Sequence, residues 1–336
     1  MKHKSLLIIF VLIFIISCSL PQVSITQATE TPIPVTPTDT ALPFLPKPEL
    51  GLPENPLILA LGPSANSQAQ IDATNVLATQ FKDRTGYAVV TVIPDSYGAL
   101  VDALEKGNAH IALLDPLSYE LAYQKGLVQA VFAVVKDGKA TYGAQFIASR
   151  KGGFKSYFDS LSQINIADAP EALAQFANKK PCWSDETSLS GYVIPLGFLN
   201  KNQIQTRPAA FVQGHPTVVR SVYAGGICDF GATYIDARKF PSLEDQYPDL
   251  MEQVIVVWHI PEIIPYYVLA FSTNMSQPMR DLFAKTIPAI MQTDDGKTAF
   301  KAAYAIEELM PVNDAYFSEF HEYVSASKVD LSAVVK

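Results

Sequence analysis

The sequence predicts an α/β protein of two lobes, each built on an open, mostly parallel sheet, with two hinge crossings between them. Short apolar runs rich in β-branched residues alternate with segments of helical spacing, which is typical of strands and helices that alternate in a parallel sheet. The alternation occurs in two series, and apolar runs at about 142–150 and 265–273 lie between them in the chain order. We therefore expect the chain to cross between the lobes at these two segments.

The composition allows a large folded body. The chain has 336 residues, of which 49% are hydrophobic and 17% charged, enough for one large domain or two smaller ones. Its formal net charge is −8, and no basic cluster follows the extreme N-terminus. This argues against a nucleic-acid partner, which requires a dense Lys/Arg surface. A small anion remains a suitable ligand, because a helix start binds anions through local dipoles and not through net charge.

The N-terminus has the features of a signal peptide, which we place at residues 1–17. Lys2 and Lys4 precede an apolar run at 6–16 that is too short to span a membrane. The run ends in Ser17-Cys18, which resembles a bacterial lipobox, so we expect Cys18 to carry the lipid. The alternative is an anchor helix that happens to contain a cysteine. Either arrangement places the mature chain outside the cytoplasmic membrane.

Residues 18–55 are rich in Pro and Thr and show no helical or strand period, so we expect an extended tether. The first lobe is predicted to comprise residues 56–143 together with 271–336, and the second lobe residues 144–270. The tail from 276 to 334 is expected to be helical, to lack strands of its own and to pack onto the first lobe.

The first lobe opens with three strand–helix pairs. Strands are expected at 57–61, 89–93 and 110–114, with helices at 71–85, 97–106 and from Asp115 onward, where a proline stands near the helix start. In such sheets a ligand lies at the carboxyl ends of the strands. Ser64, Tyr97 and Tyr119 are therefore expected on one rim.

The second lobe follows a pair of strands, 131–135 and 142–149, that we expect to form a hairpin around a turn at 136–139. Helices are expected at 170–177 and 215–223, and strands at 210–212, 228–234 and 254–258. The apolar run at 266–271 is expected to be the return partner of 142–149. These elements surround the stretch on which the functional prediction depends.

That stretch, residues 181–192, is predicted to be a strand end, a hydroxyl-rich turn and the start of a helix. Thr187, Ser188 and Ser190 stand where N-caps occur, and Gly191 lets another atom approach the backbone. A helix start has unpaired N–H groups and the positive end of the helix dipole, so neighbouring hydroxyls complete a cradle for an oxyanion. An ordinary capped helix that binds nothing is the alternative.

Two cysteines other than Cys18 occur, Cys182 and Cys228. In an exported protein a remaining pair favours one disulfide, which would hold the base of the cradle if the two strands are neighbours. Two buried free thiols are the alternative. Two cysteines and scattered histidines do not favour a metal site, and we expect neither metal nor cofactor.

Six motifs stand in a fixed order along the folded body. They are Asp95-Ser96-Tyr97-Gly98-Ala99-Leu100, Asp115-Pro116-Leu117-Ser118-Tyr119, Lys136-Asp137-Gly138-Lys139-Ala140-Thr141-Tyr142, Ser188-Leu189-Ser190-Gly191-Tyr192, Gly214-His215 and Gly231-Ala232-Thr233-Tyr234-Ile235-Asp236. In this order they resemble the phosphate/phosphite/phosphonate-binding proteins of ABC importers, over residues 57–291. The resemblance implies the type II periplasmic-binding fold, a clamshell in which a closed cleft holds a tetrahedral anion.

The resemblance also implies roles for single residues. Ser188 and Ser190 would hold the anion, Tyr97 and Tyr119 would face it from the first lobe, and His215 would lie beside it. Alternatively, the two tyrosines are packing residues at helix starts and the histidine is an N-cap. The full set of candidate ligand-binding residues is Ser64, Tyr97, Tyr119, Thr187, Ser188, Ser190, Gly191, Tyr192, His215, Thr217, Tyr234 and Asp236.

Two departures from the family pattern bear on the ligand, and so do three acidic residues. Leu189 replaces the middle Thr of the turn, which removes a hydroxyl donor. Pro216 stands where many phosphonate binders have an acidic residue, which disfavours an aminoalkyl phosphonate. Asp115 replaces the usual Gly before Pro-Leu-Ser-Tyr, and it would repel an anion, as would Asp185 and Glu186, if it faced the cleft unpaired. A ligand other than a phosphonate is left open.

No nucleophile elbow, zinc-protease helix or P-loop is present in the sequence, so we expect no enzyme. The predicted function is that of a lipid-anchored, monomeric solute-binding subunit that delivers a small oxyanion to an ABC permease in the membrane. A sensory or interaction lipoprotein that uses the same clamshell to signal to a membrane partner is the alternative. A hydrolase or transferase built on this fold is a third hypothesis.

Overall fold

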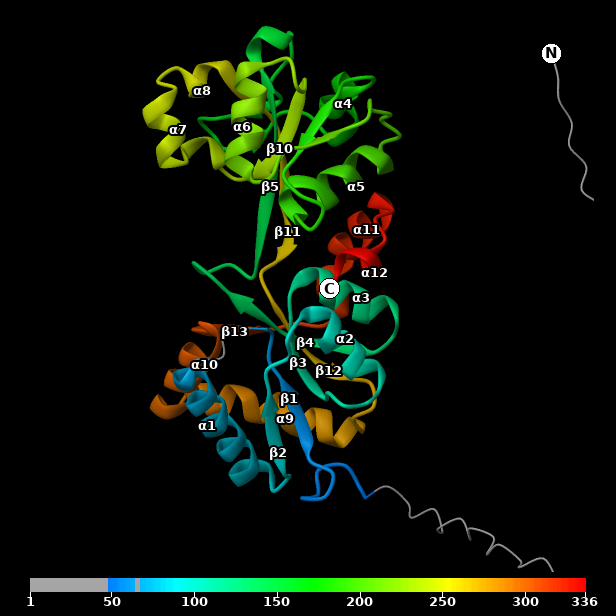
Figure 1. The fold of residues 1–336 in the computed structure, drawn as a ribbon, viewed down its shortest axis with the longest axis vertical. Coiled ribbons are helices and arrows are strands. Elements are labelled where there is room, and N and C mark those ends of the chain that lie inside the picture. The colour runs from blue at the N-terminus through cyan, green and yellow to red at the C-terminus, as the bar shows by residue number, and fades with distance from the viewer. Residues whose placement is uncertain (1–47, 64–66) are drawn as a thin grey trace, which may run out of the picture. The chain divides into compact units, whose positions relative to one another are not determined.

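Two sheets organise residues 48–63 and 67–336, which are the residues that the computed structural model describes (Figure 1). The first sheet has six strands in the order β13-β4-β12-β3-β1-β2, and the second has five in the order β11-β5-β10-β8-β9. We call the six-stranded sheet with the helices that cover it the first lobe, and the five-stranded sheet with its helices the second lobe. The predictions made for residues 1–17, Cys18 and Ser64 lie outside the described residues.

The first sheet begins with the predicted strand–helix alternation. β1 pairs in parallel with β2 and with β3, whereas β12 is antiparallel to β3 and β4, and β13 is antiparallel to β4. The strands are β1 (Leu57–Ala60), β2 (Val89–Val92), β3 (Ile111–Leu114), β4 (Val128–Val135), β12 (Val268–Ser272) and β13 (Glu308–Pro311). The sheet is therefore mixed, and the expectation of a mostly parallel sheet is wrong.

Helices cover both faces of this sheet, and each starts where the sequence offers a cap. Ser67 and Gln70 form a capping box at α1, Ser96 caps α2, and Asp115 caps α3 with Pro116 in the first turn. The helices of this region are α1 (Gln68–Thr85), α2 (Tyr97–Glu105), α3 (Pro116–Gln124), α9 (Gln277–Met291), α10 (Asp294–Tyr304), α11 (Ser318–Ser327) and α12 (Leu331–Val334), with a 3₁₀ turn at Asp314–Phe317.

The second sheet contains the strand that leads into the hydroxyl turn. β8 lies between β9 and β10 and is parallel to both, while β5 is antiparallel to β10 and β11. Its strands are β5 (Thr141–Ser149), β8 (Pro181–Trp183), β9 (Ala210–Phe211), β10 (Phe230–Tyr234) and β11 (Val254–Pro265). A separate ribbon is formed by β6 (Phe158–Asp159) and β7 (Ile164–Asn165).

The helices of the second lobe are short, and several begin with a proline in the first turn. They are α4 (Ala169–Leu173), α5 (Ile194–Lys201), α6 (His215–Ala224), α7 (Pro241–Gln246) and α8 (Leu250–Gln253), with a π-helix at Leu189–Val193 and 3₁₀ turns at Arg150–Gly152, Ala174–Phe176 and Ala237–Lys239. Buried aromatic rings fill the core beside β8, where Phe176 stacks on Phe230 with ring centroids 4.0 Å apart.

The chain crosses between the lobes at 136–140 and at 266–267. The expected hairpin of 131–135 with 142–149 does not form, because β4 joins the first sheet and β5 the second, with only a turn between Lys136 and Lys139 to connect them. Likewise, β12 pairs with β3 and β4, so 266–271 is not the return partner of 142–149; β11 takes that place. The predicted boundaries at 143/144 and 270/271 each cut through a strand.

The C-terminal tail differs from its prediction in two respects. It contributes a strand, β13, to the first sheet. Its helix α11 packs against α5 of the second lobe, where Tyr323 stacks on Phe198 with centroids 3.6 Å apart and Asn200 donates to the carbonyl of Ala326 at 3.0 Å. Only part of the tail therefore packs on the first lobe.

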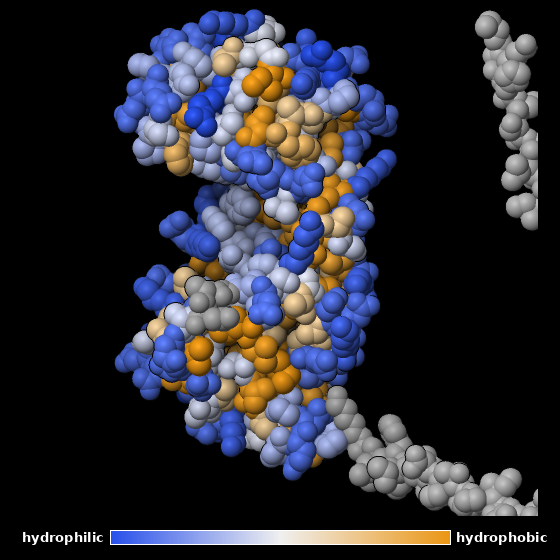
Figure 2. All heavy atoms as spheres, in the orientation of Figure 1, coloured by the Kyte–Doolittle hydropathy of each residue, from blue (hydrophilic) through white to orange (hydrophobic). Residues whose placement is uncertain are grey.

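Residues 48–55, expected as the end of the tether, have turn structure and contact the body. Gly51 donates to the carbonyl of Asn55 and accepts from the N–H of Ala88, both at 2.8 Å. No helix among residues 48–63 and 67–336 is long and apolar enough to cross a membrane. On the face that Figure 2 shows, polar residues predominate and apolar residues form patches between them.

Candidate functional site

The hydroxyl turn lies between the end of β8 and the start of α5, as the sequence predicts. Ser188 caps the turn, since its Oγ accepts the N–H of Gly191 at 3.0 Å. The N–H of Ser184 donates to the carbonyl of Gly191 at 3.3 Å, which folds the turn back on the strand end. The helix begins as a π-helix at Leu189, so its first N–H groups lie beside these hydroxyls.

Three polar side chains converge on Gly191. A Cβ at this position would lie 2.0 Å from Ser184 Oγ, 2.8 Å from Ser188 Oγ and 2.9 Å from His215 Cε1. The three side chains come from the end of β8, from the turn and from the start of α6. We call Ser184, Ser188, Ser190, Gly191 and His215 the cradle. Glycine is required here because the backbone approaches these atoms so closely.

The cradle contains polar atoms without internal partners. Among the described residues, Ser184 Oγ and His215 Nδ1 are buried and have no hydrogen-bond partner. Buried polar atoms are nearly always paired, so such atoms suggest a group that completes them. The hydroxyl of Ser190 is also buried, and Ser188 Oγ lies 3.5 Å from His215 Nε2.

The environment of His215 favours the neutral form of its imidazole. Burial lowers its pKa, and the nearby carboxylate of Asp185 opposes this effect only in part. The ring of Tyr234 lies edge-on to it, with centroids 4.8 Å apart. A neutral imidazole retains one N–H, so His215 can donate a hydrogen bond to an oxyanion at neutral pH.

Tyr97, at the start of α2, and Tyr267, in the crossing at 266–267, are neighbours. Burial, with the neighbouring phenol of Tyr267, raises the pKa of Tyr97, so its hydroxyl stays protonated and able to donate. The hydroxyl fits against Gly62, where a Cβ would lie only 2.6 Å from it. A cavity of about 400 Å³ lies beside Tyr97 and Tyr267 and is also lined by Lys136.

Tyr142, at the start of β5 just after the first crossing, stacks on Tyr266 of the second crossing with ring centroids 5.1 Å apart. Burial raises its pKa to about 12, the phenol of Tyr266 adds to this, and the hydroxyl of Ser190 beside it acts in the opposite direction. Tyr267 and Asp115 of the first lobe are also near enough to raise this pKa. Tyr142 therefore lies where groups of both lobes meet.

Sequence reasoning missed two residues of this site. Tyr142 belongs to a quoted motif but was expected in a hairpin, and its place beside a crossing was the signal that pointed to it. Ser184 gave no signal except that it follows a strand end directly. Leu189, which replaces the family's threonine, is buried in the core and contributes no hydroxyl.

Several predicted ligand-binding residues have other partners. Tyr119 is fully buried and donates to Asp314 Oδ1 at 2.7 Å, so it packs against the C-terminal segment and the prediction that it faces the ligand is wrong. Asp236 forms an ion pair with Arg238 at 2.6 Å and accepts from Gln145 at 2.8 Å, which occupies its carboxylate.

The remaining predicted residues lie around the cradle. Thr187 donates to Asp185 at 2.9 Å, and Thr217 accepts from Arg220 at 3.1 Å. The ring of Tyr192 packs edge-on to Phe211. In the part of the chain that the structure describes, no group of three or more His, Cys, Asp or Glu is suited to hold a metal ion.

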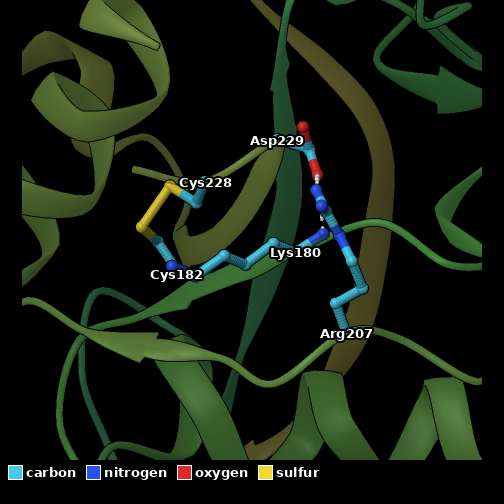
Figure 3. Close-up of a disulfide and its surroundings, with 5 residues drawn as sticks. All are labelled: Lys180, Cys182, Arg207, Cys228 and Asp229. Carbon is cyan, nitrogen blue, oxygen red and sulfur yellow. Dashed lines mark hydrogen bonds and ion pairs between the residues drawn. A yellow bond between two sulfur atoms is a disulfide. The ribbon is translucent and has the colours of Figure 1, made fainter. Parts of the chain in front are cut away.

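The predicted disulfide is confirmed. Cys182 in β8 is bonded to Cys228, which lies just before β10, with Cα atoms 5.6 Å apart (Figure 3). Beside it, Asp229 accepts from Arg207 at 2.6 Å and from the N–H of Lys180 at 2.7 Å. These contacts join β10 to β8, the strand that leads into Ser184 of the cradle.

Comparison with known proteins shows the family. The family of periplasmic substrate-binding proteins of phosphonate ABC transporters matches residues 59–317. The chain belongs to this family. Its members are transporter binding proteins and not enzymes, in agreement with the sequence prediction, and they work outside the cytoplasm.

Individual relatives are distant. The phosphate-import protein PhnD of Mycolicibacterium smegmatis is 28% identical over 195 residues, which cover 55% of this chain and 56% of that protein. The chain thus spans about half the length of this relative. XAC2383 from Xanthomonas citri, solved bound to ATP, is 14% identical with a TM-score of 0.58, over 81% of this chain and 97% of the other. The structure of the same protein bound to chloride ion is 15% identical with a TM-score of 0.56, over the same shares of the two chains. These structures share the fold, and the predicted periplasmic-binding fold class is confirmed.

Proposed function

We propose that the protein is the lipid-anchored substrate-binding subunit of an ABC importer and that it binds a phosphonate, phosphite or phosphate-like anion in the cradle. The observation that carries the proposal is the convergence of Ser184, Ser188 and His215 on Gly191. Family membership and the phosphate-import relative support the substrate class.

The cradle suits a tetrahedral oxyanion because it offers donors from several directions. The hydroxyls of Ser184 and Ser188 and the ring of His215 lie around Gly191 at the helix start. The buried hydroxyl of Ser190 is next to Gly191 in the chain, and a neutral His215 keeps one N–H to donate. Tyr97 and Tyr142 supply protonated phenols. An anion bound to both groups would favour the closed state of the hinge, with 136–140 and 266–267 as its pivots.

Ser190→Ala tests the cradle directly. Removal of this buried hydroxyl should weaken binding by about 1–3 kcal/mol, since a partner on the ligand is left unsatisfied. Calorimetric titration of the purified full-length protein in detergent, with methylphosphonate, phosphite, phosphate, sulfate and 2-aminoethylphosphonate, would measure this loss. Ser221→Ala, a buried serine almost two turns into α6, is the matched control and should bind as the wild type does. Equal affinity of wild type and Ser190→Ala would contradict the proposal.

The lipid anchor is proposed from the sequence of residues 15–18. Cells grown with a labelled fatty acid should incorporate the label into the wild type and not into Cys18→Ser. The variant should also leave the membrane fraction. A membrane permease is the partner that this function requires, and co-purification with the complete importer would test it.

A further inference from the structure

The cavity of about 400 Å³ in the first lobe lies at one edge of the six-stranded sheet. Three of its lining residues stand at strand ends, since Gly62 comes just after β1, Lys136 just after β4 and Tyr267 just before β12. β12 is antiparallel to both β4 and β3, and β3 is parallel to β1, so all these ends share one edge. Both crossings to the second lobe start from this edge, so the cavity lies beside them.

The cradle lies at the corresponding edge of the second sheet. β5 starts at Thr141, directly after the first crossing, and it is antiparallel to β10. Because β10 is parallel to β8, the end of β8, with Ser184 just beyond it, lies at the edge where β5 starts. Ring contacts connect the two edges: Tyr142 stacks on Tyr266, and Lys136 Nζ lies 5.3 Å from the centre of the Tyr266 ring. The cavity and the cradle are therefore at the two edges that the crossings join.

The lining of this cavity is cationic. Lys136 and Lys301 are its charged residues, and no Asp or Glu is among the described residues that line it. Lys301 is paired with Glu307, whereas no ion pair among residues 48–63 and 67–336 includes Lys136. The ammonium group of Lys136 instead lies 5.3 Å from the ring centres of both Tyr266 and Tyr267. In a chain whose formal net charge is −8, such a lining favours an anionic group over a cationic one.

Tyr304, at the end of α10, supplies a further donor to the cavity. Its hydroxyl is buried and has no hydrogen-bond partner in the part of the chain that the structure describes. Burial also raises its pKa, so the hydroxyl keeps its proton at neutral pH. Because buried hydroxyls are nearly always paired, Tyr304 indicates an acceptor that the chain itself does not provide. A carboxylate or phosphoryl oxygen accepts from a phenol and from an ammonium group, and it would complete the lining.

We propose that this cavity is a second anion site, and that the ligand carries, besides the tetrahedral group in the cradle, a second acidic group that Lys136 and Tyr304 bind. The inference rests on the proposed function and narrows its substrate class to phosphonates or organic phosphates whose substituent ends in a carboxylate or a further phosphoryl group. Methylphosphonate, phosphite and phosphate have no such group. A separate inorganic anion offers the same chemistry, and the stoichiometry of binding distinguishes the two sources.

Calorimetric titration of the full-length protein in detergent with a matched series of phosphonates is the test. Phosphonoacetate, 3-phosphonopropionate and 4-phosphonobutyrate carry a carboxylate at increasing distance from the phosphonate, whereas methylphosphonate and propylphosphonate carry none. The wild type should bind the best of the three carboxylates at least about tenfold more tightly than methylphosphonate, because a hydrogen bond between charged groups is added. Propylphosphonate has as many carbon atoms as 3-phosphonopropionate, and it should show no such gain.

Two variants test the residues of the site. Lys136→Met should remove the advantage of the carboxylate ligand and change the affinity for methylphosphonate far less. Tyr304→Phe should weaken binding of the carboxylate ligand about fivefold without lowering the melting temperature, since the hydroxyl has no partner within the described ranges of the free protein. Lys155→Met is the matched control, because Lys155 Nζ also lies over a ring, that of Tyr157 at 4.5 Å, but in the second lobe and outside both crossings. It removes the same charge and should bind every probe as the wild type does.

Three results separate the hypotheses. Binding of two phosphate ions per chain, of which Lys136→Met abolishes one, would confirm the second anion site and assign it to a separate ion. Affinities for the three carboxylates that do not exceed that for propylphosphonate, and that Lys136→Met leaves unchanged, would overturn the inference, while binding of methylphosphonate would leave the proposed function standing. Failure of every phosphonate, of phosphite and of phosphate to bind would refute the proposed function itself, and the inference with it.

Discussion

Gly191→Ala should disrupt the cradle, and the structure allows the size of the effect to be worked out. The new Cβ would lie 2.0 Å from Ser184 Oγ, while real Cβ atoms essentially never approach another atom within 3.0 Å. The hydroxyl and the turn must therefore separate by about 1 Å or more. Ser184 is fully buried, so neither group moves into open solvent.

Overpacking of this kind costs roughly 1–3 kcal/mol. Where the cost falls on the bound state, the affinity for methylphosphonate should drop by about 5- to 150-fold. Where it falls on the folded state as a whole, the melting temperature should drop by a few degrees. Calorimetric titration and thermal unfolding of the purified protein would measure the two effects separately.

A double-mutant cycle makes this prediction sharp. Ser184→Ala removes the atom that the new Cβ would meet first. The double variant Ser184→Ala/Gly191→Ala should therefore lose less stability than the sum of the losses in the two single variants. Recovery should be partial, because Ser188 Oγ would still lie at 2.8 Å. Gly153→Ala, at a positive φ with no atom within 4 Å of the new Cβ, lies outside both crossings and should change stability but not affinity. Wild-type melting and affinity in Gly191→Ala would refute the packing of the cradle.

Two further predictions concern the stability of the second lobe. The Cys182–Cys228 bond joins residues that are 46 positions apart, and its reduction should lower the free energy of unfolding by about 4 kcal/mol. Urea unfolding with and without a reductant measures this loss, and an unchanged midpoint would contradict it. Burial lowers the pKa of His259 from 6.5 to about 4, so below pH 6.5 the unfolded chain binds a proton that the folded chain excludes, and the free energy of unfolding should fall as pH drops through this window. In His259→Gln the free energy of unfolding should depend less on pH between about pH 7 and about pH 5, as urea unfolding at each pH would measure. A variant whose stability depends on pH as strongly as that of the wild type would assign the effect to other groups.

The helices and strands of the first series could be predicted because their signals are local. Ser67, Ser96 and Asp115 cap helices at the expected places. The pairing of strands could not be predicted in the same way, since it depends on residues far along the chain. β4 and β5 are separated by a short turn of hairpin type, yet each finds its partners elsewhere, and no local pattern distinguishes this from a hairpin.

The same distinction applies to the site. The hydroxyl turn could be predicted because cap residues and glycine stand together in sequence. Tyr119 could not be assigned correctly, because its partner Asp314 lies 195 residues further along the chain. Tyr142 likewise gained its position from the crossing beside it. Residues whose role depends on a distant partner were the ones that sequence reasoning misplaced or missed.

Tyr119, which contacts the C-terminal segment and not the ligand site, lies next to a helix that contacts both lobes. On one side, the ring of His321 of α11 stacks on that of Tyr123 of α3, with centroids 4.0 Å apart, and its Nδ1 is hydrogen-bonded to the buried Glu120. On the other side, Tyr323 of the same helix stacks on Phe198 of α5. Because α11 contacts both lobes, it is a third connection beside the two hinge crossings. Any rotation of one lobe against the other must repack one of these two contacts, so the stiffness of the hinge depends on a helix that contributes no residue to the cradle.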